Sequence, residues 1–210
     1  MRIILKVMKH QKTSWQNRII ELAKKNGIVR PRDVEHNGMP REYLLRLTKQ
    51  GTLERIGRGL YALPGSLQSE SRQMAEIAKR VPHGVVCLLS ALQYHNLTTQ
   101  LPHETWLALE SPGWRPKVDY PPVRIIWMTR KPFEFGIEEH HIDRVLVRVY
   151  GVAKTVADCF KFRNKVGIDV AIEALREVRQ HRTVSMDSLW EAAKVCRVTR
   201  IMRPYMEAIS

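Results

Sequence analysis

Hydrophobic residues in the first part of the chain repeat with the spacing of an α-helix. Across residues 15–26 they occupy one stripe, Ser14 stands before the segment as a candidate N-cap, and Gly27 follows it as a helix terminator. The stripe consists of Ile19, Ile20, Leu22 and Ala23. The pattern predicts a first helix over these residues.

Two further helices are predicted on either side of the pair Asn37-Gly38, which is typical of a tight turn. Residues 30–36 form the shorter one, with Pro31 in its first turn, and residues 40–50 form the longer one, ended by Gly51. The apolar face of the longer helix comprises Met39, Tyr43, Leu44 and Leu47. Its other side carries Arg41, Leu45, Arg46, Thr48 and Lys49. One face is therefore expected to pack on the domain while the other presents basic side chains.

Residues 53–63 have the pattern of a hairpin, with two short strands around Gly57-Arg58-Gly59. Glycine supplies the positive φ values that a tight hairpin turn needs. Helix, turn, helix and basic hairpin in this order are the layout of a winged helix-turn-helix. We therefore predict such a domain over residues 1–65.

Residues 66–210 predict a larger mixed α/β domain, entered through a linker at residues 64–71. Strands are indicated by short segments rich in β-branched and aromatic residues, at residues 106–109, 123–128 and 145–150. Helices are predicted at residues 69–80, at 90–94 after an extended entry at 85–89, and in a helical C-terminal part at 155–163, 167–181, 185–196 and 199–209. The predicted fold class is α+β.

The chain is strongly basic, and its charge is concentrated near the N-terminus. Its 210 residues carry 35 Lys and Arg against 21 Asp and Glu, a formal net charge of +14, of which +9 falls in residues 1–65 and +5 in residues 66–210. Such a charge attracts polyanions. Nucleic acid is therefore the first partner to consider, and an anionic membrane surface is the rival.

No segment of the sequence indicates a membrane partner or export. A run of about 18 apolar residues is absent, and lysines interrupt residues 1–9 too early for the apolar core of a signal peptide. The three cysteines, Cys87, Cys159 and Cys196, are far apart and odd in number, so they predict buried free thiols instead of a disulfide or a zinc site. We expect a cytoplasmic protein, located at the nucleoid when bound to DNA.

The predicted winged domain suggests which side chains contact double-stranded DNA. The second helix of such a motif, here residues 40–50, enters the major groove, where arginine can donate two parallel hydrogen bonds to guanine. We expect Arg41 and Arg46 to read bases. Further contacts are expected from Thr48 and Lys49 on the same helix, Arg55 and Arg58 on the wing, and Arg30 and Arg32 near the second helix. Each of these residues taken alone also fits an ordinary solvated charge or polar group.

The second region offers no catalytic residue, metal ligand set or cofactor motif. Residues 138–141, Glu-Glu-His-His, match no metal-binding spacing and predict a polar loop. Four carboxylates lack a paired base and fit ordinary helix surface: Asp158, Asp169, Glu173 and Glu177. The one candidate partner surface is a basic stripe beside Phe160 and Phe162, made of Lys154, Lys161, Arg163 and Lys165. It fits a nucleic-acid backbone, an acidic protein or a solvated helix face.

Four stretches of the sequence resemble the AbiEi family of antitoxins from bacterial abortive-infection, type IV toxin–antitoxin systems. Residues 41–47 and 51–61, the latter ending in Gly-Arg-Gly-Leu-Tyr, are similar to the N-terminal winged domain of that family. Residues 89–97 and 154–165 are similar to its later part, the second of them reading Lys-Thr-Val-Ala-Asp-Cys-Phe-Lys-Phe-Arg-Asn-Lys.

This resemblance implies a non-enzymatic antitoxin, active in phage defence, that binds DNA and represses its own operon through the winged domain. It also implies that the second domain opposes a nucleotidyltransferase-like toxin, with or without direct contact. Winged domains of this kind also occur on orphan regulators that have no toxin. Two alternatives from other classes are a nucleic-acid-processing enzyme and an interaction protein that masks a partner.

Overall fold

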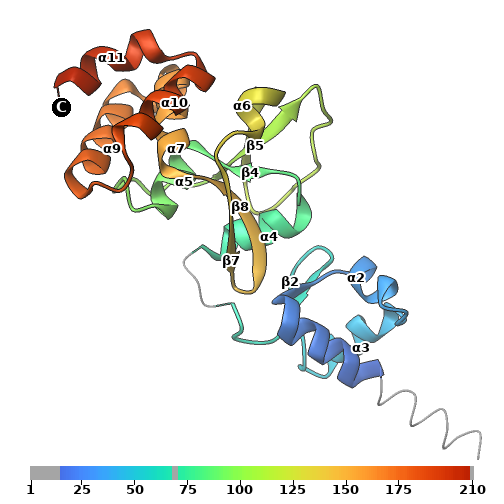
Figure 1. Cartoon of the computed structure of the whole chain (residues 1–210). Coiled ribbons are helices and arrows are strands. Elements are labelled where there is room, and N and C mark those ends of the chain that lie inside the picture. Colours follow the sequence, from blue (N-terminus) through green and yellow to red (C-terminus); the bar gives the residue numbers. More distant parts are fainter. Residues whose placement is uncertain (1–14, 68–70, 209–210) are drawn as a thin grey trace, which may run out of the picture. The chain divides into compact units, whose positions relative to one another are not determined.

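The computed structural model describes residues 15–67 and 71–208, which fall into two compact units (Figure 1). Unit 1 holds the described residues up to Lys79 together with His141–Val145, and unit 2 holds Arg80–His140 and the described residues from Leu146 onward. Most of helix α4 (Arg72–Arg80) thus belongs to unit 1. The division into domains at residues 65 and 66 stays a prediction. Ser14, the candidate N-cap, lies outside the described residues, as does Ser69, the predicted start of the helix that became α4.

Unit 1 begins with three short helices and a small antiparallel sheet. The helices cover residues 15–26, Pro31–His36 (α2) and Glu42–Lys49 (α3). The sheet has the order β1-β3-β2, with β1 at Ile28–Val29, β2 at Glu54–Gly57 and β3 at Leu60–Ala62. The predicted winged helix-turn-helix layout is confirmed. Strand β1 was not predicted, because two residues are too few to show a strand pattern.

One apolar core joins these helices to the sheet. Its buried side chains are Ile19, Ala23, Val29, Val34, Met39, Tyr43, Leu44, Leu47, Leu53 and Tyr61. The predicted apolar stripes of the first and third helices both point into it. Helix α3 is shorter than the predicted 40–50 because Pro40 and Arg41 form a turn, in which the Tyr43 N–H donates to the Pro40 carbonyl at 3.2 Å.

Unit 2 is built on a five-stranded mixed sheet with the order β6-β5-β4-β8-β7. The strands are β4 (Val85–Val86), β5 (Thr105–Ser111), β6 (Val123–Thr129), β7 (Ile137–Ile142) and β8 (Val145–Tyr150). β4 pairs antiparallel with β5 and parallel with β8, and β5 pairs parallel with β6. The three strands predicted from β-branched segments are confirmed as β5, β6 and β8.

Helices gather beside this sheet and enclose α7 (Figure 1). They are α5 (Leu88–Tyr94), α7 (Val152–Lys161), α8 (Arg163–Val166), α9 (Ile168–His181), α10 (Met186–Cys196) and α11 (Thr199–Ala208), with the short α6 (Arg130–Glu134) after β6. The predicted helical C-terminal part is confirmed, and Ser185 caps α10 by accepting from the Ser188 N–H at 3.1 Å. The α+β fold class is confirmed.

The prediction of a polar loop at residues 138–141 was wrong, because these residues lie in β7, an edge strand of the sheet. An edge strand has one neighbour only, so charged side chains on it stay solvated and mask the strand pattern. His140 packs beside Tyr94, with ring centroids 5.0 Å apart. No group of three or more potential metal ligands occurs among the described residues.

Cys87, Cys159 and Cys196 are free and buried, as predicted. Burial raises the pKa of the Cys196 thiol to about 12, with a further contribution from the Asp158 charge. Such a thiol is not a nucleophile at neutral pH. Within residues 15–67 and 71–208, every helix is too short or too polar to cross a membrane.

Candidate nucleic-acid interface

Helix α3 has one buried and one open face, as its sequence predicts. Tyr43, Leu44 and Leu47 are each at most 6% exposed and pack into the core of unit 1. Leu45, on the other side, is 56% exposed. The open face therefore remains available to a partner of unit 1.

Arg41 and Arg46 both lie on this open face. The Arg41 side chain is 73% exposed, and its Nε lies 3.7 Å from a Glu35 carboxylate oxygen. The Arg46 side chain is 46% exposed, with Nη2 3.5 Å from Glu42 and its guanidinium 4.8 Å from the Tyr43 ring centroid. Exposed ion pairs of this kind contribute little to stability, so both arginines can exchange them for a DNA contact at small cost.

Thr48 and Lys49 also lie on the open face, but their side chains differ in the hydrogen bonds that they can still offer to a partner. The Thr48 hydroxyl donates to the Leu44 carbonyl at 2.7 Å, so its proton is committed to the helix and its oxygen can only accept from a partner. Lys49 is exposed at the end of α3. Lys49 therefore suits a phosphate contact better than Thr48 does.

The wing is the hairpin of β2 and β3, closed by a turn in which Gly59 has φ +70°. Arg55 and Arg58 are both exposed on it. The Arg55 Nε donates to the Gly57 carbonyl at 3.3 Å, which holds the side chain close to the bulge in the hairpin. The wing thus presents one exposed cation from β2 and one from the turn.

A phosphate contact requires an exposed guanidinium, but that of Arg30 is mostly buried. Its guanidinium donates to both carboxylate oxygens of Asp33, with Nη2 2.9 Å from Oδ1, and to the Lys79 carbonyl. Only 18% of the side chain is exposed. The expected phosphate contact is therefore wrong for Arg30, whose donors join α2 to α4. Arg32, on α2, is exposed, and its phosphate contact stays a prediction.

The same cluster shifts two pKa values. Burial alone would raise the pKa of Asp33, but hydrogen bonds from Arg30 and the Lys79 charge outweigh it, so the pKa of this carboxyl is lowered. Burial lowers the pKa of Lys79, whose Nζ lies 3.4 Å from Asp33. Asp33 therefore stays ionised and holds two cations inside unit 1.

One residue near the turn was missed by the sequence analysis. Arg18 on the first helix is exposed and donates from Nη2 to the Asn37 carbonyl at 3.2 Å. Nothing in the pattern of the first helix indicates this contact, because it joins residues 19 positions apart. Arg18 adds a cation beside the turn between α2 and α3.

Lys154 does not belong to the predicted basic stripe of unit 2, because it is only 1% exposed. Its ammonium group pairs with Asp158 and lies 4.0 Å from the Tyr150 ring centroid. Asp158 is also buried, against the prediction of helix surface, and accepts from the Cys196 thiol at 3.3 Å. Burial raises the pKa of Asp158, although the Lys154 charge opposes this. This pair belongs to the core of unit 2 because other helices enclose α7.

The other three residues of the stripe sit on two helices. Lys161 ends α7, with Nζ 5.8 Å from the Phe162 ring centroid. Arg163 begins α8 and donates to the Phe160 carbonyl at 3.1 Å, while Lys165 is exposed. A partner surface at these three residues stays a prediction.

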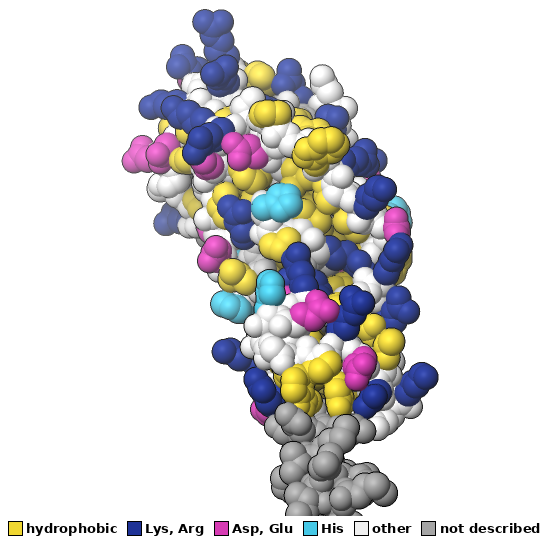
Figure 2. Space-filling model, turned by 90° about the vertical axis from the view of Figure 1, so that its right-hand side faces the viewer, with side chains coloured by type: hydrophobic (Ala, Val, Ile, Leu, Met, Phe, Trp, Pro, Cys, Tyr) yellow, Lys and Arg dark blue, Asp and Glu magenta, His cyan; other side chains and the backbone are white. Residues whose placement is uncertain are grey.

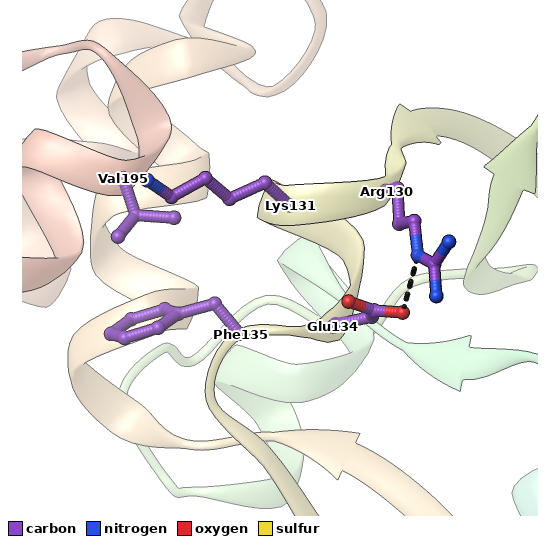
Figure 3. Close-up of a pocket in the computed structure, with 5 residues that line it drawn as sticks. All are labelled: Arg130, Lys131, Glu134, Phe135 and Val195. Carbon is purple, nitrogen blue, oxygen red and sulfur yellow. Dashed lines mark hydrogen bonds and ion pairs between the residues drawn. The ribbon is translucent and has the colours of Figure 1, made fainter.

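A shallow pocket of about 420 Å³ lies between α6 and α10 (Figure 3). It is lined by Arg130, Lys131, Glu134, Phe135 and Val195. Arg130 is tied to Glu134 at 3.0 Å, and the lining contains no hydroxyl, thiol or imidazole group.

Comparisons with known proteins agree with this geometry. Residues 17–64 match the family model described as "Transcriptional regulator, AbiEi antitoxin". The matched segment contains α2, α3 and the wing, so the resemblance seen in the sequence is confirmed there: this segment is similar to the antitoxin transcriptional regulators that the model describes.

Among solved structures, the RV2827C protein from Mycobacterium tuberculosis has a similar fold. The TM-score is 0.61 at 11% sequence identity, over 93% of this chain and 80% of that one. At this identity the likeness concerns the fold alone. No curated protein matches the chain significantly.

Proposed function

We propose that this protein is a DNA-binding antitoxin that represses its own toxin–antitoxin operon. In this proposal α3 enters the major groove of double-stranded DNA, Arg41 and Arg46 read bases, and Lys49, Arg55, Arg58 and Arg32 contact phosphates. The second part of the chain opposes a nucleotidyltransferase-like toxin. The protein itself performs no catalysis.

One observation carries the DNA-binding part of the proposal. Helix α3 buries Tyr43, Leu44 and Leu47 and leaves Arg46 exposed, as is Arg41 at its start, in a segment that matches the model of antitoxin transcriptional regulators. The major groove is about 12 Å wide and accepts one helix.

The test is a band-shift or anisotropy titration of the full chain on the DNA upstream of its gene. We expect Arg46→Ala to weaken binding about 5- to 150-fold and to relax base preference at one position, because a bidentate contact to guanine discriminates by about 1–3 kcal/mol.

Arg130→Ala is the matched control for this variant. Arg130 is also an exposed helical arginine with a glutamate partner four residues away, at 3.0 Å, but it lies in unit 2. It should bind like wild type. If Arg46→Ala and Arg41→Ala also bind like wild type, then α3 is not the helix that reads DNA.

The antitoxin part of the proposal has a separate test. Co-expression with the product of the neighbouring gene should relieve growth inhibition by a nucleotidyltransferase-like toxin, and Arg46→Ala should retain this relief because it acts on DNA. If the neighbouring gene is no toxin and operator binding still holds, the protein is an orphan winged regulator.

A further inference from the structure

Unit 2 exposes aromatic side chains on the loop that joins β5 to β6. Trp114 is 96% exposed, Tyr120 is 64% exposed, and Trp127 on β6 is 39% exposed. Exposed large aromatic side chains mark places where partners bind. Figure 2 views the chain from the side on which this loop lies in Figure 1, and shows hydrophobic side chains open to solvent among Lys and Arg side chains.

The loop is anchored at both ends. A methyl group at Gly113 would lie 2.7 Å from the Glu110 carbonyl oxygen and 3.1 Å from Cζ3 of Trp127, so the chain leaves β5 packed closely against β6. At the other end, the Pro122 carbonyl accepts a hydrogen bond from the Thr105 N–H at 2.9 Å. The aromatic side chains are therefore presented from a constrained backbone.

The exposed rings follow the edge of the sheet. Because β5 and β6 are parallel and β6 is an edge strand, the loop must run back along β6 before entering it. Trp114 thus lies towards the end of β6, and Tyr120 lies at its start. A strand of this length spans about 20 Å. Among the described residues no ring pair involves Trp114, Tyr120 or Trp127. Trp114 and Tyr120 stand mostly in solvent, whereas Trp127 packs against Gly113 and leaves only part of its side chain open.

Two cations lie between these rings in the sequence. Arg115 and Lys117 are exposed, and neither forms an ion pair within the part of the chain that the structure describes. Arg124 on β6 differs, since it pairs with Glu104 at 2.6 Å. Open rings interleaved with unpaired cations are complementary to unpaired bases joined by phosphates, because each base stacks on a ring and each phosphate attracts a cation.

We propose that Trp114, Arg115, Lys117, Tyr120 and Trp127 form a binding surface for a single-stranded polynucleotide. A duplex fits poorly, since its bases are already stacked on one another. The rings contact base faces and the cations contact phosphates, neither of which includes the 2′-hydroxyl group. DNA and RNA strands are therefore bound alike. This surface does not depend on the proposed function of α3.

The test is fluorescence anisotropy of the full chain with labelled oligothymidylate and oligouridylate, each about 15 nucleotides long. We expect both to bind. Trp114→Ala should weaken both about 5- to 150-fold, since stacking on one aromatic side chain is worth about 1–3 kcal/mol per base, and Trp114→Phe should keep most of the affinity. Leu101→Ala is the control: Leu101 is a 75% exposed apolar loop residue, and its removal should change nothing.

Duplex binding by α3 and single-strand binding by the aromatic surface can be tested independently of each other. Trp114→Ala should leave binding to the upstream duplex unchanged, and Arg46→Ala should leave binding to oligothymidylate unchanged. If wild type binds neither oligonucleotide, or if Trp114→Ala binds both as wild type does, the surface proposal is wrong. If Trp114→Ala instead abolishes self-association in analytical ultracentrifugation and leaves oligonucleotide binding intact, the surface serves a second copy of the chain and the proposal is overturned.

Discussion

Lys154 and Asp158 form an ion pair inside the core of unit 2. A lysine and an aspartate four residues apart on a helix are usually a surface pair, yet both side chains here are at most 1% exposed. The ammonium group also lies over the Tyr150 ring, and the carboxylate accepts from the Cys196 thiol. Each charge is tolerated in the core because the other neutralises it and because neighbouring groups satisfy its hydrogen bonds.

Replacing Lys154 by Met should lower the free energy of unfolding by about 3–5 kcal/mol, because Asp158 would be left as an unpaired buried carboxylate. Urea denaturation followed by circular dichroism measures this. In the double variant Lys154→Met/Asp158→Leu, most of the lost free energy of unfolding should be restored. Lys165→Met, at an exposed position, should cost little. An equally small loss for Lys154→Met would contradict the buried pair.

At the scale of elements, unit 1 holds α2 and α4 together through one carboxylate. Asp33 accepts from the backbone N–H and the guanidinium of Arg30, and Lys79 of α4 approaches it to 3.4 Å. Arg30 also donates to the Lys79 carbonyl. This cluster fixes the start of α2, the helix that precedes the turn into α3.

The cluster should make stability depend on pH in one direction. The pKa of Asp33 is lowered from 3.8 in the folded protein. The contribution of Asp33 to the free energy of unfolding is therefore complete above pH 3.8, and it is lost as the pH falls towards the lower pKa of the folded state. Asp33→Asn should therefore destabilise the protein at pH 7, and the difference from wild type should shrink as the pH falls below about 4.

Glu35→Gln is the control for that experiment. Glu35 lies on the same helix, but its side chain is exposed and its contact with Arg41 is long, at 3.7 Å. Its unfolding curves should follow those of wild type across the same pH range. A difference between Asp33→Asn and wild type that grew towards low pH would refute the assignment.

For the whole molecule, the net charge of +14 governs how binding depends on salt. Each phosphate contact releases counterions, so the logarithm of the binding constant falls linearly with the logarithm of salt concentration. In the face that Figure 2 shows, Lys and Arg side chains are spread widely with some acidic groups between them. The salt dependence can therefore separate cations that touch the duplex from those that do not.

Arg58→Ala should lower duplex affinity for all sequences and reduce the magnitude of the salt slope by about one, because one phosphate contact is removed. Titrations between about 50 and 200 mM salt measure this. Arg176→Ala removes an exposed cation from α9 of unit 2 and should leave the slope unchanged. A slope that falls equally in both variants would show that the wing makes no specific phosphate contact.

Local pattern was enough to predict the winged helix-turn-helix, the strands β5, β6 and β8, the C-terminal helices and the open face of α3. Periodicity, glycine and proline report on backbone conformation within a few residues, which is why these elements could be found. The short strands β1 and β4 and the polar edge strand β7 depend on pairing with distant strands. Their sequence signals are therefore weak.

The basic charge, the apolar stripes and the order of elements can be read directly from the residues, because these are local or additive properties. Which charged side chains reach solvent depends on the folded chain. The tertiary structure enclosed Lys154 and Asp158 beneath neighbouring helices, turned Arg30 inward to Asp33, and left Arg46 and Trp114 in solvent. A side chain is buried or exposed according to what packs over it, and those packing residues are far away in the chain.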